Sequence, residues 1–173
     1  MNTLQSGDHV LMVETGHFAS LWRNMANKLG VLTEFLKTDW RSGASPEELA
    51  VRLLKDTSHK IKAICVVHNE TSTGCTSPIA KIRKIMDELN HPALLMVDTI
   101  SSLASIDYRH DEWGVDVTVA GSQKGLLLPP GLSFNALSQK ALEISIKGGM
   151  ARSYWYWNEQ IQANKNVAIP YTH

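Results

Sequence analysis

The sequence predicts an α/β fold of three layers, α/β/α, in which helices cover both faces of a mainly parallel sheet. Short runs of β-branched and aliphatic residues, typical of strands buried on both faces, alternate along the chain with segments whose apolar residues recur at helical spacing. Such alternation favours parallel strands joined by right-handed helical crossovers. A chain of 173 residues can bury one sizeable core, so we expect one domain over residues 1–173.

The first half of the chain contains three strand-and-helix units. Gly30 directly follows the first apolar helical pattern and is predicted to cap its C-terminus. Ser45 and Pro46, followed by two glutamates, predict the start of the second helix, because serine caps helix N-termini and proline fits the first turn. Strands are predicted at residues 10–13, 32–36 and 61–67, and apolar helix faces at 18–29, 49–54 and 79–89.

The second half continues with strands predicted at residues 93–98, 115–120 and 133–137 and a helix at 138–146. After them comes Ser153–Trp157, a dense aromatic run ahead of a polar segment at 158–166. In a monomer this run would form an exposed apolar patch, and such patches often mark interfaces between proteins. We therefore expect residues 153–157 to lie at a subunit contact.

The composition excludes several classes of function. Lysine plus arginine equal aspartate plus glutamate at 17 each, so the chain has no basic surface of the kind that nucleic acids or anionic membranes require. Cys65 and Cys75 have neither zinc-site nor disulfide spacing and are expected to be reduced thiols. The start of the chain lacks a signal-peptide pattern, and no apolar run has membrane-spanning length. We expect a cytoplasmic protein that acts on a small metabolite.

Two of the predicted strands end on a charged residue. The run Leu94–Val97 is followed by Asp98, and the run 117–121 is followed by Ser122, Gln123 and Lys124. Ligands of open α/β sheets bind outside the carboxyl ends of parallel strands, so this acid and this amine should face one crevice. Pyridoxal phosphate needs such a pair, because a lysine binds its aldehyde and an acid keeps its pyridine nitrogen protonated. A structural ion pair at the sheet edge is the alternative explanation for these two residues.

Three segments of the chain together resemble a known family. In order, they are His68–Gly74 (HNETSTG), Val97–Leu103 (VDTISSL), and Gly121–Gly125 (GSQKG) with Pro129–Gly131 after it. With them the chain resembles the class V aminotransferases of fold type I, and is most similar to the serine-glyoxylate and alanine-glyoxylate enzymes. The resemblance runs from about Gly7 to the last residue.

This resemblance implies a fold and a subunit arrangement. It implies the large domain of the pyridoxal-phosphate enzymes of fold type I, whose sheet has one antiparallel strand, for which residues 133–137 are the candidate. It also implies a homodimer with shared active sites. The family's upstream phosphate-binding turn and the C-terminal domain with the substrate arginine have no counterpart here, and Arg109 and Arg152 do not match that arginine. We therefore expect residues 1–173 to be an incomplete, central part of the large domain.

The resemblance also implies roles for the residues at the two strand ends. Lys124 would bind the cofactor aldehyde covalently and afterwards move the substrate Cα proton. Asp98 would contact the pyridine nitrogen, and Ile100, two residues further on the same side of an extended chain, would pack under the ring. Ser122 and Gln123 would make polar contacts to cofactor oxygens. An ordinary core isoleucine and ordinary loop chemistry are the alternatives for the last three residues.

Further cofactor contacts are implied elsewhere in the chain. Thr71 matches the family hydroxyl near the phenolic oxygen of the cofactor, and Phe18 matches the aromatic residue that stacks on the ring, with His17 as its competitor. Thr172 resembles the threonine that reaches the phosphate of the neighbouring subunit, although a frayed terminus explains it equally. Glu70 is expected only to shape its loop.

The function implied is pyridoxal-phosphate-dependent transamination between serine or alanine and glyoxylate by the parent enzyme. The partners would be small amino-acid and 2-oxo-acid substrates, and the chain by itself would have weak or no activity. Another class V enzyme such as a cysteine desulfurase is one alternative, but that group usually has histidine where this chain has Gln123. A non-catalytic remnant that only folds and associates is the other alternative.

Overall fold

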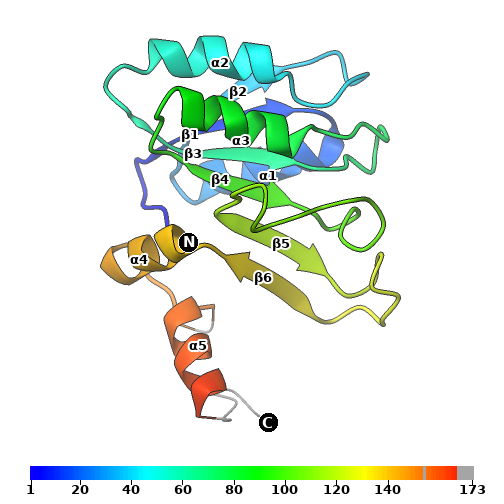
Figure 1. Cartoon of the computed structure of the whole chain (residues 1–173). Coiled ribbons are helices and arrows are strands. Elements are labelled where there is room, and N and C mark those ends of the chain that lie inside the picture. The colour runs from blue at the N-terminus through cyan, green and yellow to red at the C-terminus, as the bar shows by residue number, and fades with distance from the viewer. Residues whose placement is uncertain (154, 167–173) are drawn as a thin grey trace.

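A computed structural model describes residues 1–153 and 155–166 of the chain. One sheet of six strands runs through it in the order β2-β1-β3-β4-β5-β6, and all neighbours are parallel except β5 and β6 (Figure 1). The strands are β1 His9–Glu14, β2 Leu32–Lys37, β3 Ile61–Val67, β4 Leu94–Asp98, β5 Val117–Gly121 and β6 Ser133–Leu137. The helices are α1 His17–Lys28, α2 Pro46–Lys55, α3 Ile79–Glu88, α4 Gln139–Lys147 and α5 Trp157–Lys165.

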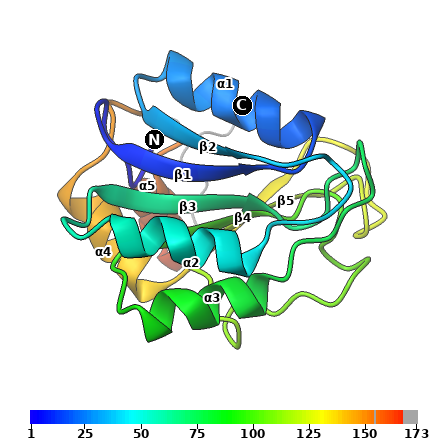
Figure 2. The same cartoon turned by 90° about the horizontal axis from the view of Figure 1, so that it is seen from above.

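Helices cover both faces of this sheet, which confirms the three-layer prediction. Helices α2 and α3 pack on one face, and α1 lies on the other (Figure 2). Each face has its own apolar core because successive strand residues point to opposite sides of the sheet. In β1, for example, Leu11 and Val13 join the core under α2 and α3, whereas Val10 and Met12 join the core shared by α1, α4 and α5.

The strand order changes direction beside β1. The chain passes from β1 to β2 on one side and then returns to place β3 on the other side of β1. The chain after β1 therefore continues into α1 on one face, and the chain after β3 continues into α3 on the other face. Open α/β sheets bind ligands outside the carboxyl ends of strands at such a change of direction. The carboxyl ends of β3, β4 and β5 lie side by side at this edge, since Val67 lies opposite Asp98, and Asp98 lies opposite Val119.

Local sequence signals explain where two helices begin. The Ser45 hydroxyl accepts the backbone N–H of Glu48 at 3.2 Å and caps α2, with Pro46 in the first turn as predicted. Ser138 caps α4 in the same way through Ala141. Helix α1 ends at Lys28 with Leu29 as its cap, so Gly30, with a φ of 78°, is the residue after the cap.

Among the described residues of the aromatic run, Trp155 is exposed and Tyr156 and Trp157 are half-buried, so the exposed apolar patch is smaller than predicted, and its place at a subunit contact stays a prediction. Trp155 is 62% exposed, but Trp157 packs against the α1-side core and begins α5. The backbone N–H of Trp157 donates to Asn2 Oδ1 at 3.2 Å, and Asn2 donates to the Trp155 carbonyl at 2.8 Å. Helix α5 was not predicted, because its residues have little apolar periodicity and a tertiary contact fixes it instead.

Two other expectations are met. Strand β6 is the antiparallel strand of the sheet, as predicted for residues 133–137. Both cysteines are free, and Cys65 is buried, with a pKa that burial raises to about 12. Within the described ranges, none of the helices is long and apolar enough to cross a membrane.

Candidate active site

The acid at the end of β4 lies in a fixed, partly buried position. Its carboxylate accepts the backbone N–H of Ile100 at 2.8 Å, and its carbonyl accepts the backbone N–H of His68 at 2.9 Å. Burial raises the pKa of Asp98 above its ordinary value, the Ile100 N–H opposes this shift, and the negative charge of Glu70 adds to it. The negative charge of Glu70 thus disfavours ionisation of Asp98.

The loop that follows β5 packs directly on the loop that follows β4. A Cβ atom at Gly125 would overlap the Leu103 carbonyl oxygen and the Ser105 hydroxyl, so the two backbones approach as closely as only glycine permits. Lys124 immediately precedes this contact. The structure therefore brings the loop that follows Asp98 against the loop that contains Lys124, and the prediction that the acid and the amine face one ligand stays a prediction.

Two more predicted residues meet at Gly121, the last residue of β5. A Cβ atom at Gly121 would lie 2.8 Å from Gln123 Oε1 and 3.4 Å from Ile100 Cδ1. The side chains of Ile100 and Gln123 therefore share the space beside this glycine. One apolar and one polar side chain thus lie together at the carboxyl end of β5.

The Lys124 side chain is exposed, and it forms no hydrogen bond or ion pair with any residue that the structure describes. Within the same residues, Asp98 also belongs to no ion pair. The alternative of a structural ion pair between them is therefore wrong. The amine of Lys124 and the carboxylate of Asp98 therefore do not neutralise each other.

The Ser122 hydroxyl is used within its own loop. Ser122 is fully buried, donates to the Pro129 carbonyl at 2.6 Å, and accepts the backbone N–H of Leu132 at 3.3 Å. Its backbone also pairs with Leu128 and Leu132. This residue thus anchors the segment that leads from Lys124 into β6, whatever further contact it makes.

Glu70 does more than shape its loop, which corrects the expectation for it. Its buried carboxylate accepts the backbone N–H groups of Phe18 at 3.2 Å and Ala19 at 3.1 Å, in the first turn of α1. It also accepts the backbone N–H of Ser72 at 3.2 Å and its hydroxyl at 2.7 Å. Burial raises the pKa of Glu70, but these hydrogen bonds outweigh burial and hold the pKa below its ordinary value.

Phe18 lies in the segment that follows β1, and Thr71 lies in the loop that follows β3. Phe18 is 44% exposed at the start of α1, with its ring edge-on to His17 at a centroid distance of 5.7 Å. Thr71 is exposed in the turn between Glu70 and Ser72. Thr172 lies outside the described residues.

Hydrogen bonds between polar side chains link the loop after β3 to the loop that follows Asp98. His68 Nδ1 lies 2.9 Å from the Ser102 hydroxyl, and the His68 ring contacts Tyr108 at 5.1 Å between centroids. The Ser101 hydroxyl donates to the Asn69 carbonyl at 2.8 Å, a second link between the same loops. Sequence reasoning missed His68 and Ser102, since these contacts join residues far apart in the chain.

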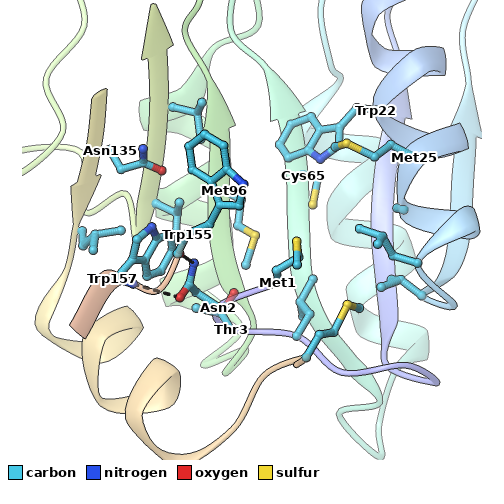
Figure 3. Close-up of a pocket in the computed structure, with 18 of the residues that line it drawn as sticks. Met1, Asn2, Thr3, Trp22, Met25, Cys65, Met96, Asn135, Trp155 and Trp157 are labelled. Atoms are coloured by element: carbon cyan, nitrogen blue, oxygen red, sulfur yellow. Dashed lines mark hydrogen bonds between the residues drawn. The ribbon is translucent and has the colours of Figure 1, made fainter. Parts of the chain in front are cut away.

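A cavity of about 630 Å³ lies elsewhere, on the α1 face of the sheet (Figure 3). Trp22 and Met25 stand on one side of it and Trp155 and Trp157 on the other, with Cys65 and Met96 between them. Its lining is mostly apolar, and it includes neither Asp98 nor Lys124. The chemistry-bearing residues are therefore at the strand ends and not in this cavity.

The donor set at the strand ends fits pyridoxal phosphate. An exposed amine, a carboxylate with a raised pKa, an apolar side chain and an exposed aromatic ring match an aldehyde, a ring nitrogen and the two faces of a flat ring. Within residues 1–153 and 155–166, no group of three or more His, Cys, Asp and Glu side chains could hold a metal ion.

Comparisons with known proteins give the family of the chain. The chain is 48% identical over 173 residues to a serine-glyoxylate aminotransferase of Hyphomicrobium methylovorum, covering 99% of this chain and 43% of the relative. It is 40% identical to an L-aspartate-glyoxylate aminotransferase of Paracoccus denitrificans, again covering 99% of this chain and 43% of the relative. The crystal structure of an alanine-glyoxylate aminotransferase from Nostoc sp. superposes with a TM-score of 0.86 at 31% identity, over 99% of this chain and 45% of that one.

The chain thus spans less than half the length of these relatives. The family model described as aminotransferase class-V matches residues 1–166, which is nearly the whole chain. The chain therefore belongs to the class-V aminotransferase family.

Proposed function

We propose that this chain carries the pyridoxal-phosphate site of an enzyme that transfers the amino group of serine or alanine to glyoxylate. The observation that carries the proposal is the contact between the Asp98 loop and the Lys124 loop at the carboxyl ends of β4 and β5. Glyoxylate as acceptor is supported by the names of these three relatives, each of which is a glyoxylate aminotransferase. Because the chain spans less than half of those relatives, we assign turnover to an enzyme that contains the whole fold.

Each residue of the site has a task that its position supports. Lys124 would hold the cofactor aldehyde and, once displaced by the substrate, would take the proton from the substrate Cα. Asp98 would hold a proton on the pyridine nitrogen, and its fixed direction through Ile100 N–H suits that task. Pyridoxal phosphate, when bound, supplies the electron sink that makes loss of the Cα proton feasible.

The remaining residues would bind and orient. Ile100 would exclude water from one face of the ring and Phe18 from the other, and Gln123 and Thr71 would contact ring oxygens. Ser122 would act mainly by holding the Lys124 segment in place. We also propose a cytoplasmic homodimer, which is consistent with two free cysteines and with an exposed Trp155.

Borohydride reduction tests the assignment of Lys124. The chain is incubated with pyridoxal phosphate, reduced and digested, and the modified peptide is found by mass spectrometry. We expect the phosphopyridoxyl group on Lys124, and its loss in Lys124→Arg. Lys84→Arg is the matched control, because Lys84 is an exposed helix residue paired with Glu88. Label on Lys81, Lys84 or Lys140 instead would refute the assignment.

A further inference from the structure

Helix α1 begins without a capping side chain of its own. Gly16 occupies its N-cap position, and its first turn contains no acidic residue. The N–H groups of a first helical turn need acceptors, and the turn carries a partial positive charge. Both needs are met from another part of the chain, by Glu70 and Ser72 in the loop after β3.

The first turn of α1 and the loop after β3 are in close contact. The Ser72 hydroxyl accepts the backbone N–H of His17 at 2.9 Å, next to the two N–H groups that Glu70 accepts. A Cβ atom at Gly16 would lie 2.5 Å from Glu70 Cγ and 2.6 Å from Ser72 Oγ, so any other residue there would push the carboxylate away. Three consecutive N–H groups of α1 are thus held by one loop.

We propose that Glu70 is a positioning residue, whose carboxylate clamps the first turn of α1 and so sets Phe18 beside the crevice at the strand ends. This inference rests on the proposed function, because it gives Phe18 a cofactor ring to cover. It goes further because it makes the position of the Phe18 ring depend on Glu70, a residue that need not touch the cofactor.

The clamp has a consequence for anions. A helix N-terminus is a common site for a phosphate group, but the N–H groups of Phe18 and Ala19 already donate to the Glu70 carboxylate. The buried negative charge of Glu70 repels a second anion at the same place. The N-terminus of α1 therefore orients an aromatic side chain and does not bind the cofactor phosphate.

Glu70→Gln tests the charge of the clamp at nearly constant shape. A carboxylate accepts from all four donors, whereas the glutamine amide must turn its NH₂ group toward some of them. Ser45→Ala is the matched control, because it removes the N-cap of α2, a helix that takes no part in the site. Circular dichroism and thermal unfolding establish that both variants fold.

The first measurement needs no cofactor. In native-state hydrogen exchange, we expect the amides of Phe18 and Ala19 to exchange at least about tenfold faster in Glu70→Gln than in wild type, since hydrogen bonds to a charged group are the strong ones. In Ser45→Ala the same amides should keep their wild-type rates. Unchanged exchange at Phe18 and Ala19 in Glu70→Gln would refute the clamp.

The second measurement titrates pyridoxal phosphate by its absorbance and by quenching of tryptophan fluorescence. We expect Glu70→Gln to bind about tenfold more weakly than wild type, and Ser45→Ala to bind as wild type does. If Glu70→Gln binds pyridoxal phosphate as tightly as wild type while the α1 amides exchange faster, Glu70 is only a helix cap and the positioning role is refuted. If wild type itself shows no binding, the proposed function fails and the positioning role fails with it, whatever the exchange rates of α1.

Discussion

The carboxylate of Asp98 accepts the backbone N–H of Ile100 at 2.8 Å, so the chain that leaves β4 turns back onto the acid that ends the strand. This hydrogen bond fixes the direction of the carboxylate, because the donor belongs to the loop that directly follows Asp98. It also ties Ile100, whose side chain reaches Gly121 of β5, to the same geometry. The position of the Asp98 carboxylate is therefore coupled to that of the Ile100 side chain.

Replacing this acid by its amide separates charge from shape. In a complete enzyme with these motifs, Asp98→Asn should keep the fold, because the amide oxygen can still accept the Ile100 N–H. Transamination should fall by about 10³-fold or more, because the amide cannot hold the ring nitrogen protonated. Steady-state rates would show this, with Asp107→Asn, an exposed partner of Arg109, as the control. Near-normal turnover of Asp98→Asn would contradict the role of Asp98.

Gly125 offers a test of the contact between the two loops. In Gly125→Ala the new methyl group would overlap the Leu103 carbonyl, so the Lys124 loop must shift. We expect a loss of stability of about 1–3 kcal/mol and loss of the borohydride-trapped label on Lys124. Gly74→Ala is the control, since a Cβ there meets open space and costs only the strain of a φ of 75°. Wild-type labelling in Gly125→Ala would show that the contact does not position Lys124.

The buried histidines should make stability fall in mild acid. Burial lowers the pKa of His68, His91 and His110 in the folded chain. The unfolded chain then binds more protons than the folded chain below a pH of about 6.5, so stability is complete above that pH and decreases as the pH falls. Thermal unfolding between pH 7.5 and 5.5 measures this loss.

His68→Asn gives the corresponding control. The asparagine amide can replace Nδ1 in the contact with Ser102 and does not titrate. We expect its melting temperature to depend less steeply on pH than that of wild type. An equal slope would mean that other groups govern the acid response.

Association of the chain should depend on Trp155. This side chain is 62% exposed at the rim of the cavity of Figure 3, and burying an aromatic side chain in a contact with a second copy is favourable. Sedimentation velocity should show a weaker dimer for Trp155→Ser than for wild type. Leu54→Ser, on the outer side of α2 and 61% exposed, should leave association unchanged. Equal association of all three proteins would place the contact elsewhere.

The sequence was sufficient for the parts of this molecule that local patterns determine. Alternating apolar periods predicted the six strands and four of the helices. The positions of Asp98 and Lys124 at strand ends predicted that both face one ligand, and the structure shows a contact between their loops. Helix α5 was missed because its position depends on the contacts of Trp157 with Asn2 and the core, at the other end of the chain.

The same distinction explains what was missed at the candidate site. Glu70 looks like an ordinary loop residue in the sequence, because Phe18, whose backbone N–H it accepts, lies 52 residues earlier in the chain. One signal was available, namely that α1 starts at Gly16-His17 without a capping side chain or an acid. A helix that begins in this way requires an acceptor from elsewhere, and a buried glutamate near a strand end is a candidate for it.

The position of β1 between β2 and β3 also bears on how the chain is made. Strand β1 is synthesised before β2, which can pair with it soon afterwards, but the other edge of β1 stays open until Ile61–Val67 has been synthesised. Contacts between distant segments form slowly, and unpaired strand edges aggregate. The nascent chain therefore passes through a period in which β1 is paired along one edge only, and chaperone binding during translation should peak before β3 emerges.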